Sequence, residues 1–137
     1  MVDAIARYRA ASEAQDVEGV VGTLASDAEL VSPISGRLVF RGTDDLRALF
    51  TALFATVAHI DWDREVGDGP VRVLVGTAAV GPFRLTDAMV VELDGSGRIM
   101  RLRPHLRPWL GLTVLALTLG PRVARHPGVV RRALRRA

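Results

Sequence analysis

The 137-residue chain is 49% apolar, enough for one well-buried core with little room for a second, and it has no cysteine for a disulfide, a thiolate nucleophile or a metal. All fifteen acidic residues lie at or before Asp94, whereas ten of the eighteen basic residues, all arginines, lie from Arg98 onward. This asymmetry indicates an anionic partner or an acidic surface within the same molecule, and the N-terminus lacks the order of a secretory signal peptide, so we expect a cytoplasmic protein.

The first two predicted elements are amphipathic helices. Residues 3–15 place Ile5, Tyr8 and Ser12 at helical spacing. Asp16 has the character of an N-cap for a second helix over residues 17–25, whose apolar stripe is Val20, Val21 and Leu24.

A short hairpin and a third helix follow. Residues 29–33 and 37–40 are β-prone runs separated by a bend. Thr43 and Asp44 are predicted to cap a helix over residues 45–57. Its stripe is the clearest in the chain and consists of Leu46, Leu49, Phe50, Leu53 and Phe54.

The rest of the predicted sheet comes from four extended segments, near residues 58–66, 71–80, 84–94 and 98–105, with glycine-rich turns between them. A tight reversal at residues 94–97 joins the last two. Helices followed by consecutive antiparallel strands indicate an α+β fold rather than a doubly wound one.

Three short motifs, in this order, resemble the nuclear transport factor 2-like superfamily and its SnoaL-like members over roughly residues 1–107. They are residues 27–32 (DAELVS), 40–46 (FRGTDDL) and 94–99 (DGSGRI). The resemblance implies a curved antiparallel or mixed sheet wrapped around N-terminal helices as a cone, a cystatin-like roll. It also implies a small-molecule cavity and dimerisation through the outer face of the sheet, without implying one activity.

Asp87 is the main candidate for chemistry. Period-two alternation places it on the more apolar face of its strand, with Leu85 and Met89. Apolar surroundings would raise the pKa of its carboxyl group toward the range of a general base. A salt bridge to an arginine, or a position near the wet mouth of the cone, is the structural alternative.

A three-residue connection that pairs Asp94 with Arg98 would set Asp87 opposite His105 and Met89 opposite Arg103. The sequence then predicts a carboxylate–imidazole dyad, with Arg103 holding an enolate or carboxylate oxygen. A structural ion pair or a solvated Arg103 is the alternative, and a slip of one residue abolishes the dyad.

Other polar and aromatic residues have weaker functional signals. His59, Asp61 and Asp63 alternate along one strand and could bind a divalent cation, but a solvated edge strand explains them better, and we expect neither metal nor cofactor. Tyr8, the only tyrosine, points into the cavity or packs in the core. The expected cavity wall also includes Trp62, Leu85, Met89, Phe50 and Phe54.

The limonene epoxide hydrolase type of site is disfavoured by this sequence. The resemblance aligns Arg72 with the arginine of that site, but Leu74 and Pro104 stand where its acids should be. Epoxide hydrolysis by that route is therefore not expected.

Residues 108–137 form a predicted helical extension to a cone domain of residues 1–107. Its apolar run of twelve residues is too short to span a bilayer and is followed by arginines among apolar residues. The run either packs over the cone's mouth or a dimer, with its arginines facing the acidic body, or attaches to an anionic membrane surface; nucleic acid is disfavoured.

The sequence therefore predicts a SnoaL-like domain, dimeric, that binds a hydrophobic small molecule. If it is an enzyme, the expected reaction is cofactor-independent proton transfer on a hydrophobic carbonyl or polyketide-like substrate, with Asp87 or His105 as the base. The alternative is a non-catalytic interaction domain that docks on a membrane or a protein through its basic tail.

Overall fold

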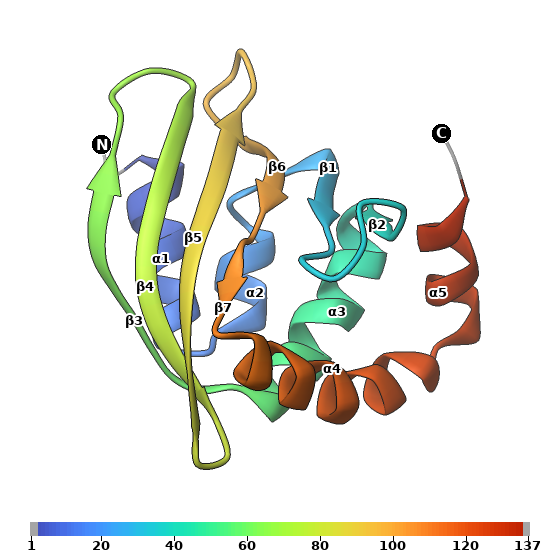
Figure 1. Cartoon of the computed structure of the whole chain (residues 1–137). Helices are drawn as coiled ribbons and strands as arrows, with labels where there is room; N and C mark the ends of the chain where they lie inside the picture. Colours follow the sequence, from blue (N-terminus) through green and yellow to red (C-terminus); the bar gives the residue numbers. More distant parts are fainter. Residues whose placement is uncertain (1–2, 136–137) are drawn as a thin grey trace.

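The computed structural model describes residues 3–135 as a curved sheet with helices against one face (Figure 1). The helices are α1 (Ala4–Glu13), α2 (Val17–Val21), α3 (Thr43–Thr56), α4 (Trp109–Ala124) and α5 (Pro127–Leu134). The strands are β1 (Leu24–Val31), β2 (Val39–Arg41), β3 (Ala58–Val66), β4 (Val71–Val80), β5 (Phe83–Leu93), β6 (Ile99–Arg103) and β7 (Leu106–Arg107).

The sheet is mixed and open, with strand order β2-β1-β6-β5-β4-β3 and with β7 continuing along β5 beyond β6. β1 and β6 run parallel, and the other neighbouring strands are antiparallel. The predicted α+β class with a curved, mixed sheet around N-terminal helices is confirmed. β4 and β5 are the longest pair, joined from Val71↔Glu92 to Val80↔Phe83, and they form the wall on which the interior is built.

Some predicted boundaries are wrong. The first strand runs from Leu24 to Val31 rather than over residues 29–33. The second helix ends at Val21 rather than near residue 25, because β1 already begins at Leu24, which pairs with Ile99 of β6. Thr43 and Asp44 lie inside α3, whose N-cap is Gly42 at φ 85°, with no side-chain cap bond. A positive φ favours glycine, and this residue turns the chain directly from β2 into α3.

The core lies between the sheet and helices α1 to α3. Its fully buried members include Ile5, Leu46, Phe50, Leu74 and Ile99. The stripe predicted on the third helix supplies Leu46, Leu49 and Phe50 to this core, so the helical period correctly identified the buried face.

β3 is an edge strand, and α1 protects it at Trp62. The Trp62 backbone N–H donates to Glu13 Oε2 (2.9 Å), and its carbonyl accepts from Arg9 Nη2 (2.9 Å). The indole Nε1 donates to the buried Ser12 Oγ (2.8 Å). These bonds satisfy backbone groups that an edge strand would otherwise expose, and they fix the indole against the sheet.

The C-terminal helices close one end of the fold. α4 crosses the lower end of the cone and α5 turns back beside β2 (Figure 1). The side chains of Leu115 on α4 and Val129 on α5 are buried, and Arg132 makes a two-pronged bond to the buried Asp45 of α3 (2.9 and 2.8 Å). Within residues 3–135, no helix has the length and apolar character needed to cross a membrane.

Candidate functional site

An apolar cavity of about 350 Å³ lies between the sheet, α1, α3 and the C-terminal helices. Its size falls within the range of small-molecule sites, and its wall is largely hydrophobic and aromatic, as in such sites. The lining residues include Tyr8, Leu30, Leu49, Phe50, Leu53, Phe54, Ile60, Trp62, Leu85, Asp87, Leu106, Leu115 and Leu119. Among the lining residues, Asp87 is the only one with a charged side chain.

Asp87 is half-buried on β5 with its carboxyl group in this apolar wall. Burial raises the pKa of the Asp87 carboxyl to about 7, and a hydrogen bond from the His105 backbone N–H to Oδ1 (3.3 Å) opposes part of that rise. The cause is desolvation, since an apolar surrounding disfavours the charged form. At neutral pH the group is therefore divided between acid and carboxylate forms, as a proton-transfer group should be.

Tyr8 brings a second polar group to the same cavity from α1. The residue is buried, and its hydroxyl donates a weak hydrogen bond to Met89 Sδ at 3.9 Å. Burial, with the nearby negative charge of Asp87, raises the pKa of the Tyr8 phenol. Tyr8 therefore stays protonated and available as a donor to an oxygen atom inside the cavity.

Aromatic side chains hold Tyr8 in place. Its ring lies edge-on to Phe50, with centroids 6.3 Å apart, and tilted against Trp62, with centroids 6.4 Å apart. Phe54 lies next to Phe50 at 5.6 Å. Rings at these separations and angles attract one another and have few alternative packings, so the wall around Tyr8 is preformed.

The predicted pairing of Asp87 with His105, and of Met89 with Arg103, is wrong. Leu93 pairs with Ile99 as expected, but Met100 is an extra residue, and Glu92 pairs with Arg101. The one-residue shift sets Arg103 opposite Val90 and Leu106 opposite Asp87. A β-bulge thus moves both candidate side chains to the other face of the sheet.

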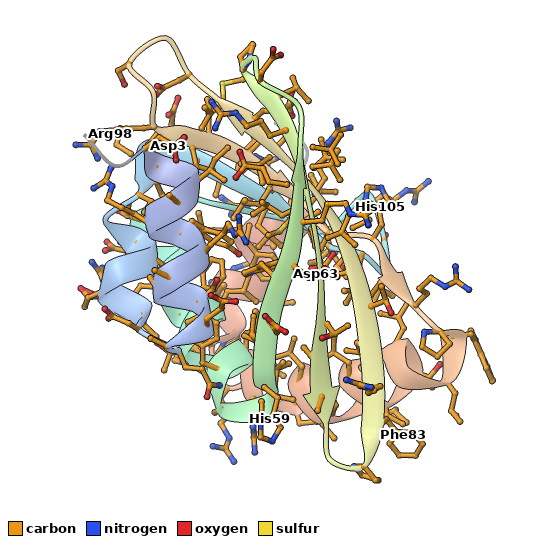
Figure 2. The ribbon with its side chains drawn as sticks, turned by 90° about the vertical axis from the view of Figure 1, so that its left-hand side faces the viewer. Asp3, His59, Asp63, Phe83, Arg98 and His105 are labelled. Carbon is orange, nitrogen blue, oxygen red and sulfur yellow. The ribbon has the colours of Figure 1, made fainter. Side chains whose placement is uncertain are left out.

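His105 and Arg103 do not line the cavity. Figure 2 shows His105 on the side of the strands away from α1, and its ring Nδ1 lies 3.1 Å from the carbonyl of Ala88. The Arg103 guanidinium is exposed, with Nε 3.8 Å from Glu92 Oε2. The contact between Asp87 and His105 therefore passes through the His105 backbone, not its imidazole.

Of the remaining predicted residues, those of the expected cavity wall lie on the cavity side of the fold. Trp62, Tyr8, Leu85, Phe50 and Phe54 contribute to the wall. Met89 is buried behind the wall and reaches the site through its contact with the Tyr8 hydroxyl. His59, Asp61 and Asp63 are exposed on the edge strand β3, and residues 3–135 contain no group of three potential metal ligands.

Two further parts of the wall were not among the predicted site residues. One is the β1–β2 connection, with Ser32, Pro33 and Ile34; the other is the C-terminal extension, with Leu115, Ala116, Leu119, Gly120, Val123, Ala124 and Val130. The apolar run in the sequence could have indicated the lining residues of the C-terminal extension. Twelve consecutive uncharged residues either cover an apolar surface of the protein or remain exposed to solvent. The helix does both, because its inner face lines the cavity and Trp109 and Leu117 are exposed.

The arrangement can bind an apolar molecule and can move a proton at one place on it. Asp87 supplies a base or an acid near neutral pH, and Tyr8 supplies a neutral hydrogen-bond donor. The Trp62 indole N–H is already used by Ser12, so it serves to position the wall.

Comparisons with known proteins agree with this fold. A bacterial protein with a cystatin-like fold from Silicibacter pomeroyi DSS-3 is 22% identical, with a TM-score of 0.86 over 95% of this chain and 93% of that one. A steroid delta-isomerase from Pseudomonas aeruginosa is 24% identical, with a TM-score of 0.80 over 91% and 92%. An LEH-like epoxide hydrolase from M. tuberculosis is 22% identical, with a TM-score of 0.62 over 89% and 93%.

Among curated protein sequences, none matches the chain significantly. The model of the SnoaL-like domain matches residues 5–102, more than two thirds of the chain, and this confirms the resemblance drawn from the three motifs. The chain therefore belongs to the SnoaL-like domain family.

Proposed function

We propose that the protein binds a hydrophobic carbonyl compound in its cavity and transfers a proton next to the carbonyl group, without a cofactor. The observation that carries this proposal is Asp87, a lone carboxyl group in an apolar wall with a pKa of about 7. Catalytic bases that act at neutral pH need a pKa near that of the solution.

The proposed step uses both polar groups. The Asp87 carboxylate takes a proton from the carbon next to the carbonyl, the C–H electron pair becomes the new C=C bond, and the carbonyl π electrons move to oxygen. The resulting enolate oxygen accepts a hydrogen bond from Tyr8, which exchanges its weak bond to Met89 for a stronger one. Protonated Asp87 then returns the proton to the same carbon or to a conjugated one.

The cavity wall also favours a class of substrate. About 350 Å³ with one charged group suits a fused-ring or polyketide-like carbonyl compound and disfavours a phosphorylated or sugar-like one. The similar structure from Pseudomonas aeruginosa is named as a steroid isomerase, which is consistent with this class. Epoxide hydrolysis is not proposed, because Leu74 is in the core and Asp87 is the only carboxylate among the lining residues.

The test uses 2-tetralone, a bicyclic ketone with acidic C–H bonds next to its carbonyl group. Proton NMR in D₂O follows loss of the C1 protons with and without protein. We expect the wild type to accelerate exchange, with a rate that rises through an apparent pKa near 7. Asp87→Asn should slow the catalysed exchange at least about 100-fold, and Tyr8→Phe about 100-fold.

Binding of 2-tetralone to each variant, measured by ligand line broadening, separates loss of chemistry from loss of the site. Binding that survives in Asp87→Asn while exchange is lost supports the assignment of Asp87 as the base. Exchange by the wild type no faster than in buffer, or unchanged exchange in Asp87→Asn, contradicts the catalytic proposal.

We propose in addition that two copies associate through the outer face of the sheet. No helix of residues 3–135 covers that face, yet it carries apolar cross-strand pairs, Val73↔Val90 and Val75↔Ala88. An uncovered apolar strip on a sheet is typical of an interface between proteins. Light scattering after size exclusion should give the dimer mass for the wild type and the monomer mass for Val75→Arg, and a monomeric wild type would contradict the proposal.

A further inference from the structure

α4 presents an apolar face to solvent that the cavity does not explain. Gly111 and Leu115 are buried on its inner face, whereas Trp109 is 78% exposed, Leu110 50% and Leu117 71%. At 100° per residue, Trp109, Leu110 and Leu117 lie within one third of the helix circumference. The helix is therefore apolar on two opposite faces, and only one of them is covered by the protein.

The same outer face lacks charge along its whole length. Arg122 is the only charged residue of α4, and it turns toward α3, where Nη1 donates to Thr56 Oγ1 (2.7 Å). Thr113 and Pro121 fill the outward positions that the large apolar side chains leave. Sixteen residues cannot cross a bilayer, but a helix of this length can lie along one.

Arginines bracket the helix at both ends. Arg107 precedes the helix, and the backbone of Arg84 on β5 lies against its first turn, since the Arg84 carbonyl is 2.9 Å from where a Cβ on Gly111 would be. The Arg84 residue itself is exposed. Arg125 follows the helix at the other end, and the sequence has no acidic residue after Asp94. A second copy placed on this face would bring arginines against arginines, whereas an anionic surface complements them.

The cavity opens along this same helix. Ala116, Gly120 and Ala124 follow one another at four-residue spacing and line the cavity, and Gly120 and Ala124 are also exposed. Ile34, on the β1–β2 connection, also lines the cavity and is 59% exposed. The residues at the opening are thus apolar, and those on α4 have small side chains. They are continuous with the outer face of α4.

We propose that the outer face of α4 docks on an anionic lipid surface, with Trp109 and Leu117 in the lipid and the bracketing arginines at the headgroups. α4 then lies in the plane of the interface, and the mouth of the cavity faces the bilayer. An apolar ligand dissolved in the membrane would enter between α4 and the β1–β2 connection without crossing water. This last step rests on the proposed binding function, whereas docking itself does not.

The test measures co-sedimentation of the full chain with vesicles of phosphatidylcholine alone and of phosphatidylcholine with phosphatidylglycerol. We expect binding to the anionic vesicles that weakens with added salt. Trp109→Ser with Leu117→Ser should weaken it at least about tenfold, since both side chains supply buried apolar area. Val66→Ser with Val71→Ser is the matched control, because these residues are 53% and 52% exposed at the β3–β4 turn, and it should bind like the wild type.

A second readout locates the helix in the lipid. The chain has two tryptophans, Trp109 exposed and Trp62 buried, so a shallow spin-labelled lipid should quench the emission of Trp109 and leave that of Trp62. Circular dichroism checks that each variant is folded. Docking is overturned if the wild type does not sediment at low salt, or if both double variants bind equally well.

Outcomes for docking and for the proposed chemistry can be told apart. Vesicle binding is measured without a ligand, so its loss leaves the 2-tetralone exchange assay unaffected, and Asp87→Asn should sediment like the wild type. If the α4 variant changes the mass in light scattering while vesicles bind no protein, the face is a contact between copies and the lipid proposal is wrong.

Discussion

Two of the walls around the cavity differ in chemistry and in construction. The wall made by the sheet and α1 carries Tyr8 and Asp87, the two ionisable groups among the lining residues, and it rests on the long β4–β5 pairing. The wall made by α4 and α5 is apolar and is held mainly by Leu115, Val129 and the bond from Arg132 to Asp45. The proposed chemistry and the proposed entry of the ligand therefore lie on separate elements, which can be altered one at a time.

The largest difference should appear when one leucine is shortened on each element. Leu74→Ala, in the fully buried wall of β4, should lower the free energy of unfolding by about 3 kcal/mol, because it leaves a void that the sheet cannot fill. Leu117→Ala, on the exposed side of α4, should change it by less than about 0.5 kcal/mol. Urea denaturation measures both, and equal losses would mean that α4 is as integral to the core as the sheet.

The charge of Asp87, in the wall made by the sheet and α1, should lower the free energy of unfolding in a pH-dependent way. Its pKa is raised on folding, so its contribution to stability is fully present below pH 4 and is lost as the pH rises through about 7. Asp87→Asn should therefore raise the free energy of unfolding by about 2 kcal/mol at pH 8, a figure reduced for partial exposure to water, and leave it nearly unchanged at pH 4. A gain that is the same at both pH values would contradict the raised pKa.

Two glycines of α4 should respond with opposite signs. A Cβ on Gly111 would lie 2.8 Å from Leu85 Cδ2 and 2.9 Å from the Arg84 carbonyl, so Gly111→Ala should cost about 1 to 3 kcal/mol by pushing α4 from the sheet. A Cβ on Gly120 meets nothing within 4 Å, so Gly120→Ala should stabilise the helix by up to about 1 kcal/mol. Thermal unfolding compares the two, and a loss in Gly120→Ala would show that the mouth is tighter than described.

The smallest effect on global stability is expected at the anchor of α5. Arg132→Gln removes the two bonds to Asp45, but the Arg132 side chain is 55% exposed, so α5 should loosen while the cone stays folded. Hydrogen exchange should then quicken in Pro127–Leu134 and stay unchanged in β4 and β5. Arg131→Gln, a neighbouring exposed position, is the control and should leave exchange in α5 as it is.

Much of the fold follows from local patterns in the sequence. The stripe on α3, the strands β3 to β5 and the turn after Asp94 were predicted nearly to the residue, because each has a strong period and clear turn residues at its ends. The C-terminal end of α2 and the start of α3 depend on tertiary pairing and on the conformation of Gly42, which local propensity does not report.

The candidate site was harder to predict, because one β-bulge determines which residues after the last turn face the cavity. Asp87 and Tyr8 were placed by the periods of their own elements, whereas His105 and Arg103 were placed by an assumed regular pairing. The sequence does hold a signal against that pairing, since Leu102, Pro104 and Leu106 alternate on one face and Ile99 is out of phase with them. An extra residue at Met100 brings Ile99 and Leu102 to the same side, where both are buried.

The central claim is that a carboxyl group in the apolar wall titrates near neutral pH, and its NMR titration tests that claim most directly. The ¹³Cγ signal of Asp87, assigned by its loss in Asp87→Asn, is followed from pH 3 to pH 9 in the full chain. We predict an inflection near pH 7 that moves upward when 2-tetralone fills the cavity and excludes water. An inflection near pH 4, unmoved by the ketone, would show that Asp87 is solvated and would remove the basis for a proton-transfer site.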